Sequence, residues 1–266
     1  MSSLAPFFLL SLFDLCSSQS VHDPEARLII NGSLTEVRYH PWVVKLNVLG
    51  RVYWPLNLGV GSGTILSNRW ILTAAHNFDD IGYGNVTTVA VKIRVGISNI
   101  TERGQVTDVE LYRCHPLYTP GSRHHDICLI KTADSLEFDD TVQPVHLPTK
   151  SDNTSNLVNI ASFGSMDEDG GGSLELRETW MVVLDKSECE KKWKNYDDSV
   201  DICTWDPLKS GPCSGDSGSG FIATRWSDRS KVILGVLTRG NCYDRAFGPR
   251  VLAYVEWIKS VMSQYE

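Results

Sequence analysis

The segment Gly215-Asp216-Ser217-Gly218 brings a hydroxyl and a carboxylate together between glycines, which suits a catalytic turn. Because glycine has no side chain, it lets backbone amides approach a reacting atom closely. Ser217 is therefore a candidate nucleophile. Its hydroxyl would need a base to accept its proton and a third group to orient that base. Since glycine and serine also dominate ordinary turns, the motif requires such partners elsewhere in the chain.

Two other segments supply candidate partners. His76 ends an apolar run that starts at Trp70, which predicts an imidazole at the end of a buried element. Asp126 begins a second apolar run, where an unpaired carboxylate would be costly to bury. The order histidine, aspartate, serine argues against an α/β-hydrolase, in which the serine precedes the histidine.

These segments resemble those of the trypsin/chymotrypsin-like serine endopeptidases, and the likeness runs from about Ile29 to the C-terminus. The resemblance implies that Ser217 is the nucleophile, His76 the general base and then acid, and Asp126 the residue orienting the imidazole. It also implies that the N–H groups of Gly215 and Ser217 form an oxyanion hole. The matching motifs, in the order of the family, are Leu72-Thr73-Ala74-Ala75-His76, Asp126-Ile127 and Gly215-Asp216-Ser217-Gly218.

The strand pattern predicts an all-β fold. Short alternating or apolar runs separated by turn residues extend from residue 43 to 130 and recur after Pro148, as in barrels and sandwiches. The resemblance implies two antiparallel β-barrels with the active site between them, followed by a C-terminal α-helix. Near the end of the chain, Tyr254, Trp257 and Ile258 fall on one helical face.

The N-terminal segment indicates a secreted precursor. Residues 1–18 combine an apolar run with small residues and predict a signal peptide, with a buried helix as the alternative. Residues 19–28 resemble an activation peptide, which leaves a protease domain over 29–266. The resemblance implies that an activating protease frees Ile29, whose ammonium then pairs with Asp216. Cleavage after Arg27 or after Leu28 stays open, because the basic residue lies one position too early.

The cysteines and sequons also fit an extracellular protein. Removal of the signal peptide leaves six cysteines, an even number typical of disulfides in an oxidising compartment. Asn85, Asn99 and Asn153 lie in sequons that predict glycosylation. The resemblance implies two disulfides, and exclusion leaves a third pair for which two separate thiols are the alternative. The pairs are Cys189 with Cys203, Cys213 with Cys242, and Cys114 with Cys128.

The primary specificity pocket is expected to be neutral. The resemblance places its floor at Gly211, followed by Pro212, and glycine cannot form an ion pair with a substrate Arg or Lys. An open, neutral floor favours an apolar residue at P1, the residue whose carbonyl is attacked, as in chymotrypsin-like or elastase-like enzymes. Asp244 is the alternative, because its carboxylate could enter the shortened pocket and restore a preference for basic residues.

One wall of the substrate cleft is expected at Thr238, Arg239 and Gly240. Arg239 stands where the family usually has tryptophan. A guanidinium there favours acidic residues upstream of the cleaved bond, or reshapes the cleft.

Composition and motifs argue against a nucleic-acid-binding, membrane-spanning or metal-dependent protein. The 266 residues include 25 basic and 32 acidic side chains with no long basic run, so nucleic acid is not an expected partner. After the first twenty residues no apolar run is long enough for a membrane span, and no metal-ligand spacing or cofactor motif occurs. We expect a monomer that acts on peptides or proteins, is cut by an activating protease and binds proteinaceous inhibitors. A catalytically silent homologue that binds a partner is the competing hypothesis.

Overall fold

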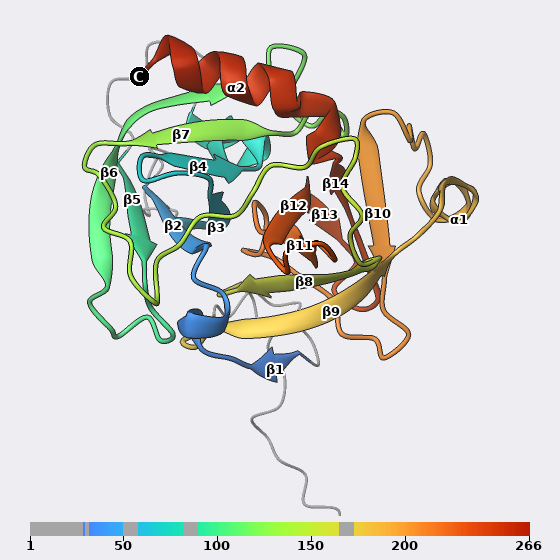
Figure 1. Ribbon diagram of the computed structural model, residues 1–266, viewed down its shortest axis with the longest axis horizontal. Helices are drawn as coiled ribbons and strands as arrows, with labels where there is room; N and C mark the ends of the chain where they lie inside the picture. Colours follow the sequence, from blue (N-terminus) through green and yellow to red (C-terminus); the bar gives the residue numbers. More distant parts are fainter. Residues whose placement is uncertain (1–28, 30–31, 50–57, 82–89, 165–172) are drawn as a thin grey trace, which may run out of the picture.

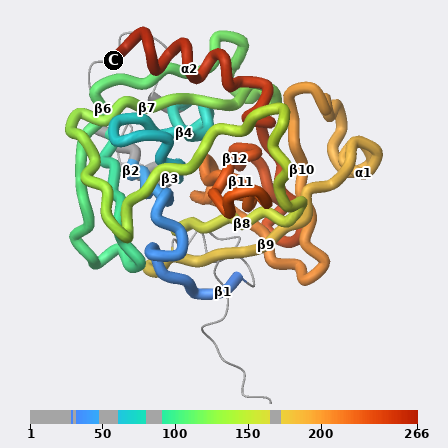
Figure 2. Tube along the Cα trace, in the orientation of Figure 1, coloured from blue at the N-terminus to red at the C-terminus, as the bar shows by residue number. Residues whose placement is uncertain are grey.

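The computed structural model describes residues 29, 32–49, 58–81, 90–164 and 173–266. The predicted signal peptide, the activation peptide and the Asn85 sequon lie outside these residues. Figures 1 and 2 show two groups of strands side by side, with the C-terminal helix across one end.

The first group is a closed antiparallel barrel. It follows the order β2-β3-β4-β7-β6-β5, so each strand has a partner on both sides. Closure leaves no strand edge unpaired, and apolar side chains from these strands pack together in a buried cluster. Its strands are β2 (Val43–Leu49), β3 (Leu58–Ile65), β4 (Trp70–Thr73), β5 (Ala90–Val95), β6 (Gln105–Cys114) and β7 (Cys128–Thr132).

The second group is an eight-stranded antiparallel sheet in the order β12-β11-β8-β9-β10-β14-β13, with β1 paired to β9. The path does not close through continuous ladders as in the first barrel. An isolated bridge between Gly235 and Arg250 connects β12 to the residue following β14, which makes the sheet barrel-like. Its strands are β1 (Ser33–Leu34), β8 (Leu157–Ser162), β9 (Arg177–Val183), β10 (Asp201–Trp205), β11 (Gly220–Thr224), β12 (Lys231–Val236), β13 (Arg239–Gly240) and β14 (Arg245–Pro249).

The described helices are short, and the longest is the C-terminal α-helix that the sequence predicted. The helix α2 spans Val255–Gln264, and its Ile258 is fully buried. Arg113 of β6 donates to the hydroxyl of Tyr265 at 3.1 Å, so the end of the chain returns to the first barrel (Figure 1). The other elements are α1 (Lys186–Lys192), η1 (Val37–Tyr39), η2 (Ala75–Ile81) and η3 (Val251–Tyr254).

A shared apolar core joins the two strand groups. Leu72 of the first barrel belongs to the same buried cluster as Ile222 and Ile233 of the second group. Removal of such apolar surface from water is the main force that holds the halves together. The candidate catalytic residues lie close in sequence to strands of this core, since His76 follows β4, Asp126 precedes β7 and Ser217 precedes β11.

Three disulfides crosslink the chain, and they join the pairs that the sequence predicted. One lies within the first half, where the paired residues of β6 and β7 are also linked through sulfur. The other two lie in the second half, one from α1 to β10 and one beside the Ser217 turn. The pairs are Cys114 with Cys128, Cys189 with Cys203, and Cys213 with Cys242.

Candidate active site

The carboxylate of Asp126 holds His76 through two hydrogen bonds. Asp126 Oδ2 lies 2.7 Å from His76 Nδ1, and Oδ1 accepts from the His76 backbone N–H at 2.9 Å. Asp126 is 1% exposed, whereas the imidazole is partly open to solvent. Because a carboxylate only accepts hydrogen bonds, Nδ1 carries the proton and Nε2 is left as an acceptor. The pair therefore presents a base of fixed tautomer and orientation.

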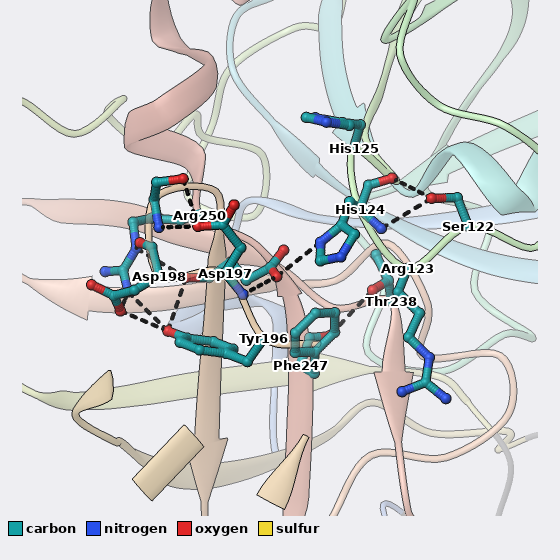
Figure 3. A network of polar contacts seen from close by, with 12 residues as sticks. Ser122, Arg123, His124, His125, Tyr196, Asp197, Asp198, Thr238, Phe247 and Arg250 are labelled. Atoms are coloured by element: carbon teal, nitrogen blue, oxygen red, sulfur yellow. Dashed lines mark hydrogen bonds and ion pairs between the residues drawn. The ribbon is translucent and has the colours of Figure 1, made fainter. Parts of the chain in front are cut away.

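The segment before Asp126 is anchored to the second half of the molecule. His125 has φ 59°, an uncommon value for a residue other than glycine, and its Nδ1 contacts the hydroxyl of Tyr254 at 3.0 Å. His124 Nδ1 lies 3.0 Å from the carboxylate of Asp201, which is fully buried. Figure 3 shows His124 and His125 pointing in different directions from the chain. These contacts fix the backbone that presents Asp126.

Ser217 lies in a turn that is tied to the first barrel. Its carbonyl accepts from the N–H of Ser62 at 2.8 Å and from the side-chain amide of Asn77 at 3.0 Å. Gly218 has φ 96°, and a Cβ there would lie 2.0 Å from the carbonyl oxygen of Ser62. Glycine is thus required for the turn to approach the barrel so closely.

Asn77 was not predicted as part of this site. The sequence indicated His76 as the catalytic candidate in this segment, yet the neighbouring Asn77 amide bonds both Thr73 Oγ1, at 3.0 Å, and the Ser217 carbonyl. A Cβ at Gly61 would lie 2.8 Å from the Asn77 amide nitrogen, so the small residue makes room for it. Asn77 thereby brings the His76 and Ser217 segments together, and its place next to His76 was the available signal.

The turn also presents unused amides. Within the described part of the chain, the N–H groups of Gly215 and Ser217 donate to no backbone carbonyl, although Gly218 donates to Leu237 at 2.7 Å. The Gly215 carbonyl accepts from the Ser62 hydroxyl at 3.1 Å. Two such amides can stabilise an oxyanion.

No hydrogen bond joins Ser217 Oγ to His76 Nε2 among the described residues. Catalytic hydrogen bonds are often long before substrate binds, so the absence of this bond does not argue against a shared catalytic role for Ser217 and His76. The structure brings together His76 and Asp126 by direct contact, and it brings Ser217 to them through Asn77.

Comparison with known proteins agrees with this arrangement. The family model described as Trypsin matches residues 29–261. The chain belongs to the trypsin family. It is 26% identical over 242 residues to Trypsin 5G1 of Aedes aegypti, covering 88% of this chain and 84% of that protein. A solved structure of HL collagenase has a TM-score of 0.74 and 25% identity, and the match covers 88% of this chain and 98% of that one. The protein is therefore a serine-type endopeptidase.

Asp216, next to Ser217 in this trypsin-family chain, is completely buried. It accepts from the N–H groups of Cys213 at 2.8 Å and Gly164 at 2.9 Å, and also from the Ser162 hydroxyl. Burial raises the pKa of Asp216 to about 6, although these hydrogen bonds and the positive charge of Lys45 oppose the rise. Burial in turn lowers the pKa of Lys45. In the uncut chain, the hydrogen bonds and the charge of Lys45 thus offset only part of the cost of burying the negative charge of Asp216.

This predicts an unusual pH dependence for the uncut protein. The folded-state pKa of Asp216 lies above its ordinary value of 3.8, so the folded state binds the proton more tightly than the unfolded state. This contribution to stability is complete below pH 4 and is lost as the pH rises through 6, a loss of about 3 kcal/mol. We expect Asp216→Asn to remove the loss, as measured by urea unfolding of both proteins between pH 4 and 7. Equal pH slopes for the two proteins would contradict it.

The primary pocket of this trypsin-family chain differs from the open floor that the sequence predicted. A Cβ at Gly211 would lie 2.5 Å from the backbone of Tyr243, so that backbone passes directly over the floor. A Cβ at Gly240 would lie 2.4 Å from the carbonyl oxygen of Pro212, so the walls also approach closely. The short segment after Cys242 explains the difference, because its backbone fills the space. The predicted floor at Gly211 is therefore closely covered by backbone.

Asp244 is engaged elsewhere. Its carboxylate accepts from the indole N–H of Trp205 at 3.1 Å and from the amide of Asn241 at 2.7 Å, and it pairs with Arg245 at 3.3 Å. These partners occupy the group that the sequence offered as an alternative determinant of basic specificity.

The remaining expectations concern surface features. Asn99 accepts from the N–H and hydroxyl of Thr101 within its sequon, and Asn153 is exposed.

Among the described residues there is no group of three or more side chains suited to hold a metal ion. None of the helices in the described ranges combines the length and apolarity needed to cross a bilayer.

Proposed function

We propose that this chain is the precursor of a secreted serine endopeptidase that cleaves peptide bonds through an acyl-enzyme at Ser217. The observation that supports it most is the doubly held His76, whose Nδ1 and backbone N–H both bond Asp126. These two hydrogen bonds fix the imidazole and leave its Nε2 as an acceptor near the turn that contains Ser217. Its substrates are peptides or proteins.

In the proposed mechanism His76 Nε2 takes the proton of Ser217 Oγ as the oxygen attacks the substrate carbonyl carbon. The negative oxygen of the tetrahedral intermediate accepts from the N–H groups of Gly215 and Ser217. His76 then gives its proton to the leaving amine, and the carbon–nitrogen bond breaks. Water, deprotonated by His76, releases the acyl group and regenerates the serine. Asp126 keeps the imidazole oriented and stabilises its charged form throughout.

Activation is proposed to begin with a cut that frees the amino group of Ile29. In the uncut chain Ile29 is buried but is joined to Leu28 through a peptide bond, so it carries no ammonium. Asp216 is buried and burial raises its pKa to about 6, which supports a role for an added positive charge beside it. A new ammonium would supply that charge and set the Gly215 turn. An activating protease and proteinaceous inhibitors are the proposed partners of this monomeric, glycosylated protein.

We further propose an apolar P1 residue, with small side chains favoured. The neutral Gly211 floor offers no ion pair, and the Tyr243 backbone leaves little depth. A methyl or isopropyl group fits such a pocket better than an aromatic ring.

The test uses recombinant chain beginning at Ile29 and peptides that differ only at P1, with Ala, Val, Leu, Phe or Arg. We expect the highest kcat/KM for Ala or Val and values at least about tenfold lower for Phe, the size expected for a misfitting apolar group. Arg as the best residue would contradict the neutral pocket while keeping the protease. No turnover from a verified Ile29 terminus would instead favour the silent binding homologue.

A further inference from the structure

Two arginines flank the cleft that contains Ser217. A cavity of about 380 Å³ is lined by Arg123, Ser217 and Arg239, together with residues of the Ser217 turn, the segment around β13 and Trp193. Arg123 lies three residues before Asp126 in the first half of the molecule, whereas Arg239 begins β13 in the second half. The two positive side chains therefore border the same cavity from opposite halves.

Neither charge is neutralised by a described carboxylate. Other arginines are paired, as Arg225 is with Asp152 at 3.1 Å. Among the described residues no carboxylate forms a salt bridge with Arg123 or Arg239, and their hydrogen bonds go to backbone carbonyls. The whole chain has a net charge of −7, so this cleft opposes the overall sign of the molecule. A local positive field in a cleft attracts anionic groups.

Arg239 is held in a defined orientation. Its Nη2 donates to the carbonyls of Gly121 at 3.3 Å and Ser122 at 3.2 Å, while its Nε is buried without a hydrogen-bond partner among the described residues. These bonds fix the guanidinium without removing its charge. They also tie down the segment that carries Arg123, so one arginine positions the other. A guanidinium fixed in advance loses little freedom when it binds a planar carboxylate.

Arg123 reaches outward from the same segment. Its side chain is exposed, and its Nη1 makes only a long contact of 3.5 Å with the carbonyl of Lys194. Figure 3 shows this side chain extending away from His124. Most of its donors thus remain available to a ligand in the cleft.

We propose that Arg123 and Arg239 form a subsite for acidic side chains, Asp or Glu, in the substrate segment upstream of the cleaved bond. The inference rests on the proposed function, because it assigns a substrate class to that site. The edge of the sheet supports an extended peptide here, since β13 ends the strand order and its Gly240 is exposed. Charge-assisted hydrogen bonds from arginine then read the acidic side chain.

The test measures kcat/KM for peptides with Ala at P1 and a single Asp, Asn or Lys at each of the three preceding positions. We expect Asp to exceed the isosteric Asn by about tenfold to a hundredfold at one or more positions, the range for hydrogen bonds to charged groups. Lys should be poorer than Asn. The preference should shrink as salt rises from 0.05 to 0.5 M, because salt screens exposed charges.

Variants assign the preference to these residues. Arg123→Gln should lower the preference for Asp over Asn at least fivefold, and Arg123→Glu should reverse it toward Lys. Arg239→Gln should also lower the preference for Asp over Asn. Arg239→Lys keeps the positive charge, and it serves as a second variant if loss of the hydrogen bonds to the Gly121 and Ser122 carbonyls disturbs folding. Arg229→Gln is the matched control, since Arg229 is an exposed arginine in the turn after β11.

Equal kcat/KM for Asp and Asn peptides at all three positions would overturn the inference and leave the protease intact. Peptide binding to Ser217→Ala, followed by fluorescence anisotropy, separates the two proposals because it needs no catalysis. Tighter binding of the Asp peptide without turnover by the parent protein would support this subsite and contradict the proposed function. Equal binding of Asp and Asn peptides would again overturn the subsite.

Discussion

Replacing His76 with alanine is expected to lower kcat by about 10⁵-fold to 10⁶-fold, the size seen when the base of a serine protease triad is removed. Ser217 then has no group positioned to take its proton, because Asp126 directs its two oxygens to His76 itself. KM should change little, since the imidazole acts mainly in the transition state. The measurement is steady-state hydrolysis of an Ala-P1 peptide by the chain beginning at Ile29.

A control variant distinguishes catalysis from stability. His146→Ala replaces an exposed histidine outside the candidate site and should leave kcat within about twofold. Urea unfolding of both variants establishes that each is folded at the assay temperature. A kcat for His76→Ala within tenfold of the parent protein would show that another group acts as the base.

Asp126→Asn should lower kcat by about 10⁴-fold at neutral pH, even though the side chain keeps its shape. An asparagine amide can donate to Nδ1, which would leave the proton of a neutral imidazole on Nε2. His76 would then face Ser217 with a donor instead of an acceptor. The same kinetic assay measures the loss.

Asp140→Asn is the matched control for this change, because Asp140 is an exposed aspartate outside the candidate site. It should leave kcat unchanged within about twofold. If Asp126→Asn retained more than a tenth of the parent kcat, the proposed role of Asp126 in orienting the imidazole would be contradicted.

The sequence predicted the elements of this site because their signals are local. The apolar run before His76 indicated a buried strand, and Trp70–Thr73 is such a strand. The fold class followed from many short strand patterns, and the family assignment from motifs in a fixed order. Both are confirmed by the structure and the comparisons. The assigned roles of the individual site residues remain predictions.

Features that depend on distant segments could not be read from the sequence. The Tyr243 backbone lies against the predicted pocket floor, Gly211, which is 32 positions earlier in the chain. The link between the Ser62 and Ser162 hydroxyls, at 2.7 Å, joins residues 100 positions apart. Arg123 carried no motif, and it became relevant only when folding placed it beside the same cavity as Arg239. Each depends on contacts between residues far apart in the chain, which local patterns do not encode.

Covalent labelling of Ser217 tests the central claim most directly. The chain beginning at Ile29 is titrated with a fluorophosphonate, in which the serine oxygen forms a bond to phosphorus as fluoride leaves, and peptide mass spectrometry locates the adduct. We expect one adduct per chain, on Ser217, that is absent from Ser217→Ala and much slower to form in His76→Ala. A folded chain with a verified Ile29 terminus and no adduct on Ser217 would contradict it.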